Sequence, residues 1–381
     1  MVLLALLLYP AAGCAEEYSF ESSTVCGKCH KDIYRNWSKS LHALSFKNPI
    51  FQTAYRRVYT ESKGAAKTIC LKCHAPTTLI TGDRDADLPI TREGITCDFC
   101  HTVTKVDMEK PPGSRFTVKP GGVKRASIKT ADSPYHETAY SKDFSSSELC
   151  GACHDYKNSA GVHIQSTYTE WSGSSFAKEG KQCQQCHMPR IPGEITNLKD
   201  KSAPPPPRTM EEYISHISEK GIPDHSLTHS VQIMKEVVRL NTRSIKRAGK
   251  ALSVVMGVTN VRAGHTVPTG TPARTLAVEL RTLDRTGAVI EKKKRIYRKA
   301  IIDDLGFGIE FDGDAFMRGK EVAYDNRLKV DETRIETFLF TKGVKYVKAI
   351  EAESYFLYRP VVTETVEMKI PVFHMEMSVP R

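Results

Sequence analysis

The chain has 381 residues, of which 26% are charged and 40% hydrophobic, a composition that excludes a disordered protein and leaves room for two or three folded domains. Beyond residue 14, no run approaches the roughly 18 apolar residues that a membrane-spanning helix needs. The formal net charge of +11 would ordinarily favour an anionic partner, such as nucleic acid or a membrane surface.

The first 14 residues, MVLLALLLYPAAGC, indicate an export signal. An apolar run ends in small residues, and Ala-Ala-Gly-Cys14 is typical of a lipoprotein box whose cysteine is acylated after cleavage. An ordinary signal peptide with an incidental cysteine is the alternative, and the positively charged start of such signals is missing. We expect export in both cases, and a lipid anchor at Cys14 that holds the protein to a membrane in the first.

Five copies of Cys-x-x-Cys-His dominate residues 15–190 and use ten of the eleven cysteines. Only Cys14 is left over, so no pair remains for a disulfide bond. Successive copies begin 44, 27, 53 and 33 residues apart. The motif residues are Cys26, Cys29 and His30; Cys70, Cys73 and His74; Cys97, Cys100 and His101; Cys150, Cys153 and His154; and Cys183, Cys186 and His187.

This motif is the attachment sequence of c-type haem. On one helical turn, positions i, i+3 and i+4 share a face, so two thiols can bond the vinyl groups while the imidazole reaches the iron of the same ring. Structural zinc would need two half-sites for each metal and no histidine after every second cysteine. A thioredoxin-like redox pair would occur once and also lacks that histidine. Five covalently bound c-type haems are therefore predicted.

The predicted haems change the meaning of the net charge. Each haem brings two propionates, so five haems add about ten negative charges and bring the holoprotein near neutrality. We expect much of the basic excess to serve the cofactors, and no nucleic-acid partner.

Eight further histidines are candidates for the sixth iron ligand, which allows bis-histidine ligation throughout. The methionines show no comparable pattern. Met188 directly follows a proximal histidine, so it cannot reach the far face of the same haem. His265 lies between a glycine and a Pro-Thr-Gly turn, where backbone can approach a ring closely. His225 and His229 would point to one place on a single helix, whereas a helix that starts at Ser226 frees His225 for a different haem. His163, His216 and His374 are the remaining candidates for a sixth ligand.

Between the motifs we expect short helices and long loops such as residues 109–134, because the porphyrins would form the core. Residues 199–208 form a proline-rich connector, and residues 209–220 are predicted to be helical. A longer helix is predicted from about Ser226 to Ala248. The apolar residues that define its buried face are Leu227, Val231, Met234, Val237, Val238 and Ile245.

From about residue 251 the pattern changes to strands, with segments that alternate or carry β-branched and aromatic residues. A hairpin turn is predicted at Asp284-Arg-Thr-Gly287. KKKRIYRK at 292–299 is either a docking patch for an acidic partner or, as we favour, a solvated strand face. The predicted strands lie in segments 252–261, 274–284, 288–301, 332–340 and 348–358.

These patterns predict an export segment at 1–14, a pentahaem cytochrome c domain of short helices and loops at 15–250 with helices at its end, and an all-β sandwich-like domain at 251–381.

The segments around the motifs resemble the cytochrome c-554 family of multihaem cytochromes. Trp37-Ser-Lys-Ser-Leu-His42-Ala is similar to the tryptophan-to-histidine segment after the first haem of that family. Thr169-Glu-Trp171-Ser with the following Gly180–Pro189 stretch resembles the approach to a later haem, and Ala263–Gly270 resembles a signature of larger relatives with a β-rich end. A fifth motif and the long C-terminal part depart from the tetrahaem pattern.

The resemblance implies closely stacked, mostly bis-histidine haems that pass electrons along a chain. It implies that His42 and His136 are distal ligands, and it supports His265 in the same role. Trp37 and Trp171 are expected to pack either against porphyrin edges or against other side chains.

We therefore expect an exported multihaem electron carrier without catalytic residues, whose partners are redox proteins or other multihaem cytochromes. One alternative is a reductase of nitrogen or sulfur oxyanions with one open haem. The familiar sequence sign of such an enzyme, Cys-x-x-Cys-Lys, is absent. A second alternative is the subunit of an extracellular haem filament.

Overall fold

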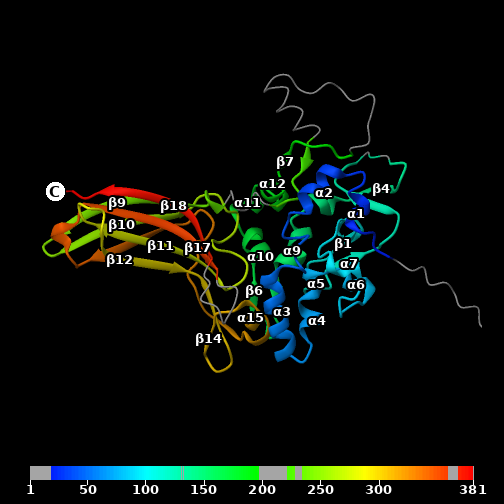
Figure 1. Cartoon of the computed structure of the whole chain (residues 1–381), viewed down its shortest axis with the longest axis horizontal. Coiled ribbons are helices and arrows are strands. Elements are labelled where there is room, and N and C mark those ends of the chain that lie inside the picture. The colour runs from blue at the N-terminus through cyan, green and yellow to red at the C-terminus, as the bar shows by residue number, and fades with distance from the viewer. Residues whose placement is uncertain are drawn as a thin grey trace, which may run out of the picture.

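The computed structural model describes residues 19–129, 131, 133–196, 221–227, 234–358 and 368–380. Short helices gather at one end of an elongated molecule, and long strands run to the other end (Figure 1). No helix within the described ranges is long and apolar enough to cross a membrane. Cys14, His216, His229 and the proline-rich connector lie outside the described residues.

The N-terminal part consists of short helices and two-stranded ribbons joined by loops. Its helices are α1 (Ser23–Cys26), α2 (Lys31–Trp37), α3 (Pro49–Glu61), α4 (Ala66–Ile69), α5 (Leu71–His74), α6 (Thr78–Thr81), α7 (Pro89–Arg92), α8 (Cys97–His101), η1 (Lys142–Ser145), α9 (Glu148–His154), α10 (Thr167–Ser172), α11 (Ser175–Lys178) and α12 (Cys183–His187). Its strands are β1 (Val103–Val106), β2 (Phe116–Val118), β3 (Val123–Ala126), β4 (Glu137–Tyr140), β5 (Tyr156–Lys157), β6 (His163–Gln165), β7 (Arg190–Ile191) and β8 (Ile222–Pro223).

The Cys-x-x-Cys-His motifs form helical turns, as their spacing predicts. Four motif histidines end α5, α8, α9 and α12, and α1 ends at the first cysteine of the first motif. The side chain of Thr96 caps α8 by accepting a hydrogen bond from the amide of Phe99. The loop predicted at 109–134 is interrupted by β2 and β3. An apolar cluster in this part holds Phe20, Phe99, Val103, Val106 and Ala152.

The C-terminal part contains two antiparallel sheets, with strand orders β16-β10-β9 and β12-β11-β17-β18. The predicted turn at Asp284–Gly287 joins β11 to β12, and the Asp284 carboxylate accepts hydrogen bonds from the amides of Thr286 and Ala288. The elements are β9 (Val238–Ala248), β10 (Ala251–Asn260), β11 (Arg274–Leu283), β12 (Val289–Tyr297), β13 (Lys299–Ile302), β14 (Gly308–Ile309), α15 (Asp312–Arg318), β15 (Glu321–Asp325), β16 (Thr333–Phe340), η2 (Val344–Tyr346), β17 (Ala349–Tyr358) and β18 (Met368–Ser378).

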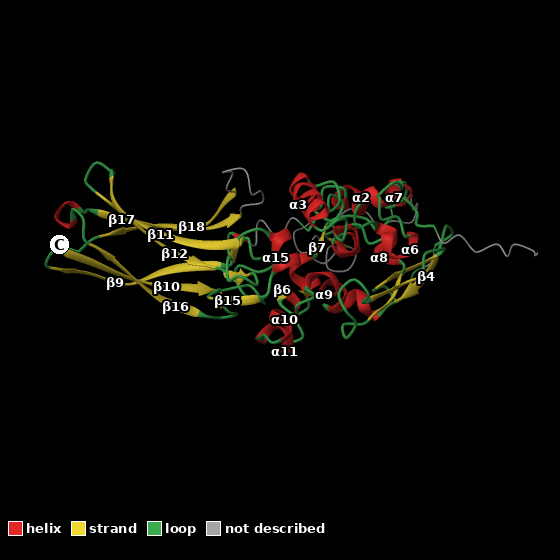
Figure 2. Cartoon of the chain, turned by 90° about the horizontal axis from the view of Figure 1, so that it is seen from below, coloured by secondary structure: helices red, strands yellow, loops and turns green. Residues whose placement is uncertain are grey.

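The two sheets share one apolar cluster. Every second residue of β10 is fully buried, and these side chains pack with buried residues of β11 and with Phe338 of β16. Figure 2 shows the two layers of strands side by side along the long axis. The cluster includes Leu252, Val254, Met256, Val258, Leu276, Val278, Leu280, Phe338, Phe340 and Ile350.

The helix predicted from Ser226 to Ala248 is wrong over its second half, where Val238–Ala248 forms strand β9. The residues at 228–233 lie outside the described ranges. Val238 and Leu240 alternate with exposed residues and join the β cluster, and β9 pairs with β10 from Val238 opposite Asn260 to Ala248 opposite Ala251. This long ladder and its buried face outweigh a helical spacing that the apolar residues satisfy only by coincidence. The strand-rich part therefore begins at Val238, before residue 251.

The charged run at 292–299 lies largely on β12, and its side chains find partners within the sheets. Lys293 Nζ lies 2.9 Å from Glu291 Oε1, and Arg295 Nε lies 3.2 Å from Glu336 Oε2. The pairing favours the solvated strand face over a docking patch.

The third sheet, β14-β13-β15, and helix α15 join the two parts. Ile164 of β6 packs with Ile301 of β13 and Ala315 of α15 in one apolar cluster. Arg57 of α3 donates from Nη2 to Asp314 Oδ2 of α15 at 3.0 Å. The strand-rich part is thus packed directly against the motif-bearing part.

Candidate haem sites

Motifs that are far apart in the sequence lie side by side. Cys26 and Cys97 lie close enough for each to shift the pKa of the other, and so do Cys73 and Cys153. Cys150 and Cys183, which belong to the motifs of His154 and His187, affect the pKa of each other in the same way.

These pairs of neighbouring cysteines show which attachment sites lie next to one another. The motif of His30 neighbours that of His101, while the motif of His154 neighbours those of His74 and His187. Cys100 acts electrostatically on both Cys150 and Cys153, which links the first pair to the other three. The five motifs therefore form one contiguous group.

Three motif histidines face a second histidine. The ring centres of His30 and His136 are 6.2 Å apart. Those of His154 and His42 are 6.4 Å apart, as are those of His187 and His265.

These separations fit an iron between two imidazoles. A metal–nitrogen bond is about 2.0 Å long, and ring bonds near 1.35 Å place each nitrogen about 1.15 Å from the ring centre. Two opposed ligands therefore have ring centres about 6.3 Å apart. The donor set and the spacing both fit the axial ligands of c-type haem.

Hydrogen bonds at Nδ1 leave Nε2 available on several of the candidate ligands. A carbonyl oxygen can only accept, so each of these rings donates from Nδ1, which fixes the tautomer with a free Nε2 as in other metal-binding histidines. The pairs are His30 with Ile195 O at 2.5 Å, His74 with Ser45 O at 3.1 Å, His101 with Arg125 O at 2.6 Å, His136 with Glu137 O at 3.1 Å, His225 with Pro223 O at 2.7 Å and His265 with Thr266 O at 3.0 Å.

His163, a reserve candidate, has the opposite arrangement. Its Nε2 lies 3.0 Å from Asp155 Oδ1, so the nitrogen that a haem would need is already bound. Another reserve, His374, lies on β18 opposite Glu353 of β17, in the strand-rich part. Neither geometry supports an axial ligand.

Burial keeps the candidate ligands neutral. Desolvation, reinforced by neighbouring histidines, lowers the pKa of His42 to about 4. Desolvation is also the largest cause for His101, His154 and His187, whose pKa values fall to about 4. Neutral imidazole is the form that binds iron, so these rings are ready to ligate at pH 7.

A short ribbon places His225. Strand β8 pairs with β7, and the amide of Asp224 donates to Pro189 O at 2.9 Å, which brings the chain back beside the last motif. The charge of His225 lowers the pKa of both His101 and His42, so His225 lies close enough to interact electrostatically with both rings. Of these two, His101 is the one without a ring partner among the histidine pairs given above.

Aromatic side chains that the sequence did not single out pack on two proximal rings. Phe51 stacks on His74, with ring centres 3.8 Å apart and an angle of 11° between the planes. Phe144 stacks on His101 at 5.2 Å and 23°. Isolated aromatic residues carry no sequence signal for this role. Within the described ranges, no histidine forms a ring pair with His74.

Trp37 anchors the segment that carries His42. Its indole Nε1 donates to Ile95 O at 2.9 Å, and the amide of Ile95 donates to His42 O at 3.0 Å. Trp171 similarly donates to Lys181 O at 2.9 Å and packs against Tyr168. Both tryptophans therefore have contacts with other side chains and backbone, one of the two environments expected for them.

Comparison with known proteins finds a family model and a solved structure to which this chain is similar. A family model described as "Cytochrome c554 and c-prime" matches residues 25–102. A penta-heme cytochrome c552 from Thermochromatium tepidum is similar in structure, with a TM-score of 0.71 and 22% sequence identity over 94% of this chain and 99% of that one. The resemblance to c-554-like multihaem cytochromes is thus confirmed.

Another solved structure is similar over only a small part of the chain. A β-glucuronidase from Bacteroides uniformis covers 37% of this chain and 13% of its own, at 13% identity and a TM-score of 0.19 that is too low to relate the folds. No curated protein sequence matches this chain.

Proposed function

We propose that this c-554-like multihaem cytochrome carries electrons one at a time through five covalently bound, mostly bis-histidine haems. The observation that carries the proposal is the opposition of proximal and distal imidazoles at 6.2–6.4 Å in three sites. When bound, c-type haem supplies one-electron chemistry. The chain supplies the thiols, the axial nitrogens and the spacing between sites.

We assign the axial ligands by geometry where the structure allows it. His136, His42 and His265 are the partners of His30, His154 and His187, and His225 is the partner of His101 on the strength of its burial, its Nδ1 hydrogen bond and its electrostatic reach. His229, which the sequence also predicts as a distal ligand, lies outside the described residues and is assigned to no site.

The order of the sites implies a branched path. Electrons would pass between the sites of His30, His101 and His154 in turn, and from the last of these to the sites of His74 and His187. The pKa interactions between cysteines of different motifs support this order, because motifs that lie close together would hold neighbouring haems. Electrons can enter at one end of the group and leave at another.

We further propose that the protein is exported, with Cys14 as a lipid anchor, and exchanges electrons with redox proteins outside the cytoplasm. The two large sheets would form a β-sandwich, supported by their shared apolar cluster. Assembly into filaments is testable by electron microscopy of the purified protein, where long fibres would extend the role to conduction between molecules.

Low-temperature EPR of the oxidised protein tests the carrier proposal. Five low-spin haems are expected if every iron has two nitrogen ligands. A high-spin signal would show an open coordination site, and it would contradict the assignment of a sixth ligand at that haem.

A further inference from the structure

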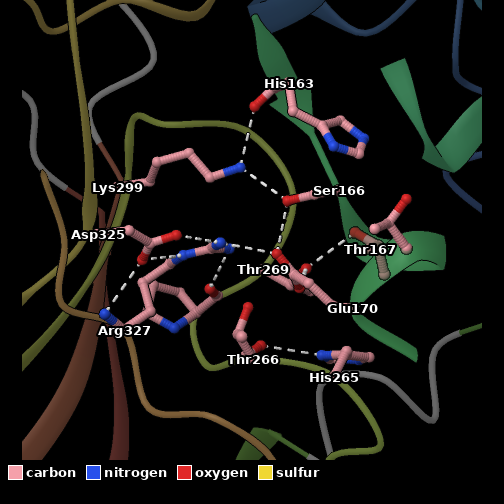
Figure 3. A network of polar contacts seen from close by, with 12 residues as sticks. His163, Ser166, Thr167, Glu170, His265, Thr266, Thr269, Lys299, Asp325 and Arg327 are labelled. Atoms are coloured by element: carbon pink, nitrogen blue, oxygen red, sulfur yellow. Dashed lines mark hydrogen bonds and ion pairs between the residues drawn. The ribbon is translucent and has the colours of Figure 1, made fainter. Parts of the chain in front are cut away.

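A buried polar network joins the strand-rich part to the loop that carries His265 (Figure 3). At its centre Arg327 Nη2 lies 2.7 Å from Glu170 Oε1, and the two side chains are only 5% and 9% exposed. Arg327, which follows β15, also donates to both oxygens of Asp325, at 2.8 and 2.7 Å. Glu170 comes from α10 in the motif-bearing part, so this ion pair spans the junction.

Both members of the pair also bind the His265 loop. Glu170 Oε2 accepts a hydrogen bond from Thr269 Oγ1 at 2.7 Å, and Arg327 Nη1 donates to Pro268 O at 3.2 Å. The residue next to Arg327 pairs with the same loop, because Leu328 and Val267 exchange two backbone hydrogen bonds of 2.8 and 3.0 Å. The loop is therefore fixed on the side that follows His265.

A second anchor fixes the other side of the loop. Asn260, at the end of β10, donates from Nδ2 to His265 O at 3.0 Å and accepts from the amide of Ala263 at 3.1 Å. With His265 Nδ1 bound to Thr266 O, the ring has a set direction and faces His187. The sequence motif alone explains none of these contacts.

Loss of either partner would change the contacts that the ion pair makes with the His265 loop. Burial disfavours the charge on Glu170, but Arg327 and hydrogen bonds outweigh it, so the pKa of Glu170 is lowered. Removing Arg327 would leave the Glu170 carboxylate, whose side chain is 9% exposed, without this charged partner, and an unpaired buried charge is strongly unfavourable. Removing Glu170 would leave Arg327 paired with Asp325 but would take away the carboxylate that binds Thr269. The loop at 263–270 would be affected directly, because Thr269 and Pro268 are bound by these two side chains.

We propose that Glu170 and Arg327 are positioning residues that hold His265 as the distal ligand opposite His187. The inference rests on the proposed function, because it needs His265 to bind the iron of the haem attached at Cys183 and Cys186. It gives the strand-rich part a role in electron transfer: to complete and align the coordination of one haem.

Four variants test the proposal by low-temperature EPR and redox titration of the intact holoprotein. Glu170→Gln removes one charge at nearly constant volume, and Arg327→Gln removes the other with a shorter polar side chain. Thr269→Val removes the hydroxyl that links Glu170 to the loop while the ion pair stays. His265→Ala identifies the signal of the affected haem. We expect His265→Ala to convert one haem in five to high spin, and the other three variants to shift the g-values and midpoint potential of that same haem alone.

Arg57→Gln is the matched control. Arg57 and Asp314 form another junction ion pair, at 3.0 Å with Asp314 only 7% exposed, and neither residue contacts the His265 loop in the structure. Arg57→Gln should leave all haem signals unchanged. An equal change in Arg57→Gln would mean that docking of the two parts, and not the loop contacts, sets the ligand, and it would overturn the proposal.

The outcomes separate this inference from the proposed function. If His265→Ala leaves the EPR spectrum low-spin throughout, the ligand assignment itself is wrong. If His265→Ala produces high-spin iron but Glu170→Gln, Arg327→Gln and Thr269→Val leave that haem unaltered, the positioning role alone is refuted. Thr269→Val decides the question even if the charge variants fail to fold.

Discussion

Replacing His42 by alanine should open one haem and leave the other four closed. His42 faces His154 with 6.4 Å between ring centres, and the methyl group of alanine cannot span that gap. Because one of five proximal histidines loses its partner, one fifth of the haem should become high-spin. The backbone carbonyl of His42, which accepts from Ile95, is retained, so the segment should stay in place.

The assay is low-temperature EPR together with the optical spectrum of the oxidised variant. Exogenous imidazole should restore the low-spin state, because it supplies the missing nitrogen to a preformed site. His163→Ala is the matched control, since its Nε2 is bound to Asp155 and its loss should change no haem. A His42→Ala spectrum that stays low-spin throughout would refute the reasoning.

Three further predictions follow from other sites. His225→Ala should convert a different haem, that of His101, so that the double variant with His42→Ala has two high-spin haems; a single high-spin haem in the double variant would contradict the pairing. Burial, followed by repulsion from Arg327, lowers the pKa of Lys299 to about 8, so the folded state gains stability as pH rises from 8 towards the unfolded value of 10.5. This gain should reach about 3 kcal/mol in chemical denaturation and disappear in Lys299→Met, and equal pH slopes for the two proteins would contradict it. Phe338→Ala, at a fully buried position of β16, should lower the free energy of unfolding by about 3–5 kcal/mol without altering the haem spectrum. Leu339→Ala, at the neighbouring position that is 52% exposed, should change the free energy of unfolding little. Equal losses in the two variants would contradict the packing described.

The sequence predicted the motifs and several long strands of the C-terminal part because local patterns determine them. Cys-x-x-Cys-His needs only one helical turn, and strands β10, β16 and β17 carry the alternation of a half-buried sheet, while β11 is buried almost continuously. The prediction of a helix ending at Ala248 failed because a local pattern does not show the tertiary partners of a segment. Its apolar spacing suits a helix, but the long partner strand β10 exists only in the tertiary structure.

The distal ligands show where sequence reasoning stops. Resemblance and glycine-rich context indicated His42, His136 and His265, yet which proximal histidine each one faces depends on contacts across more than seventy residues. Phe51, Phe144 and Arg327 belong to no motif, and the stretch at 169–172 gives no sign of the role of Glu170, because these roles arise from packing against elements distant in the chain. The proximity of Cys26 to Cys97 likewise cannot be predicted from the spacing of the motifs.

A reductive titration of the intact protein, with the haem content counted as the pyridine haemochrome, tests the central claim most directly. We expect five haems for each chain and five electrons taken up reversibly, with no haem left behind when reductant is added slowly. Fewer than five haems for each chain, or an iron that does not exchange electrons with the others, would contradict the account.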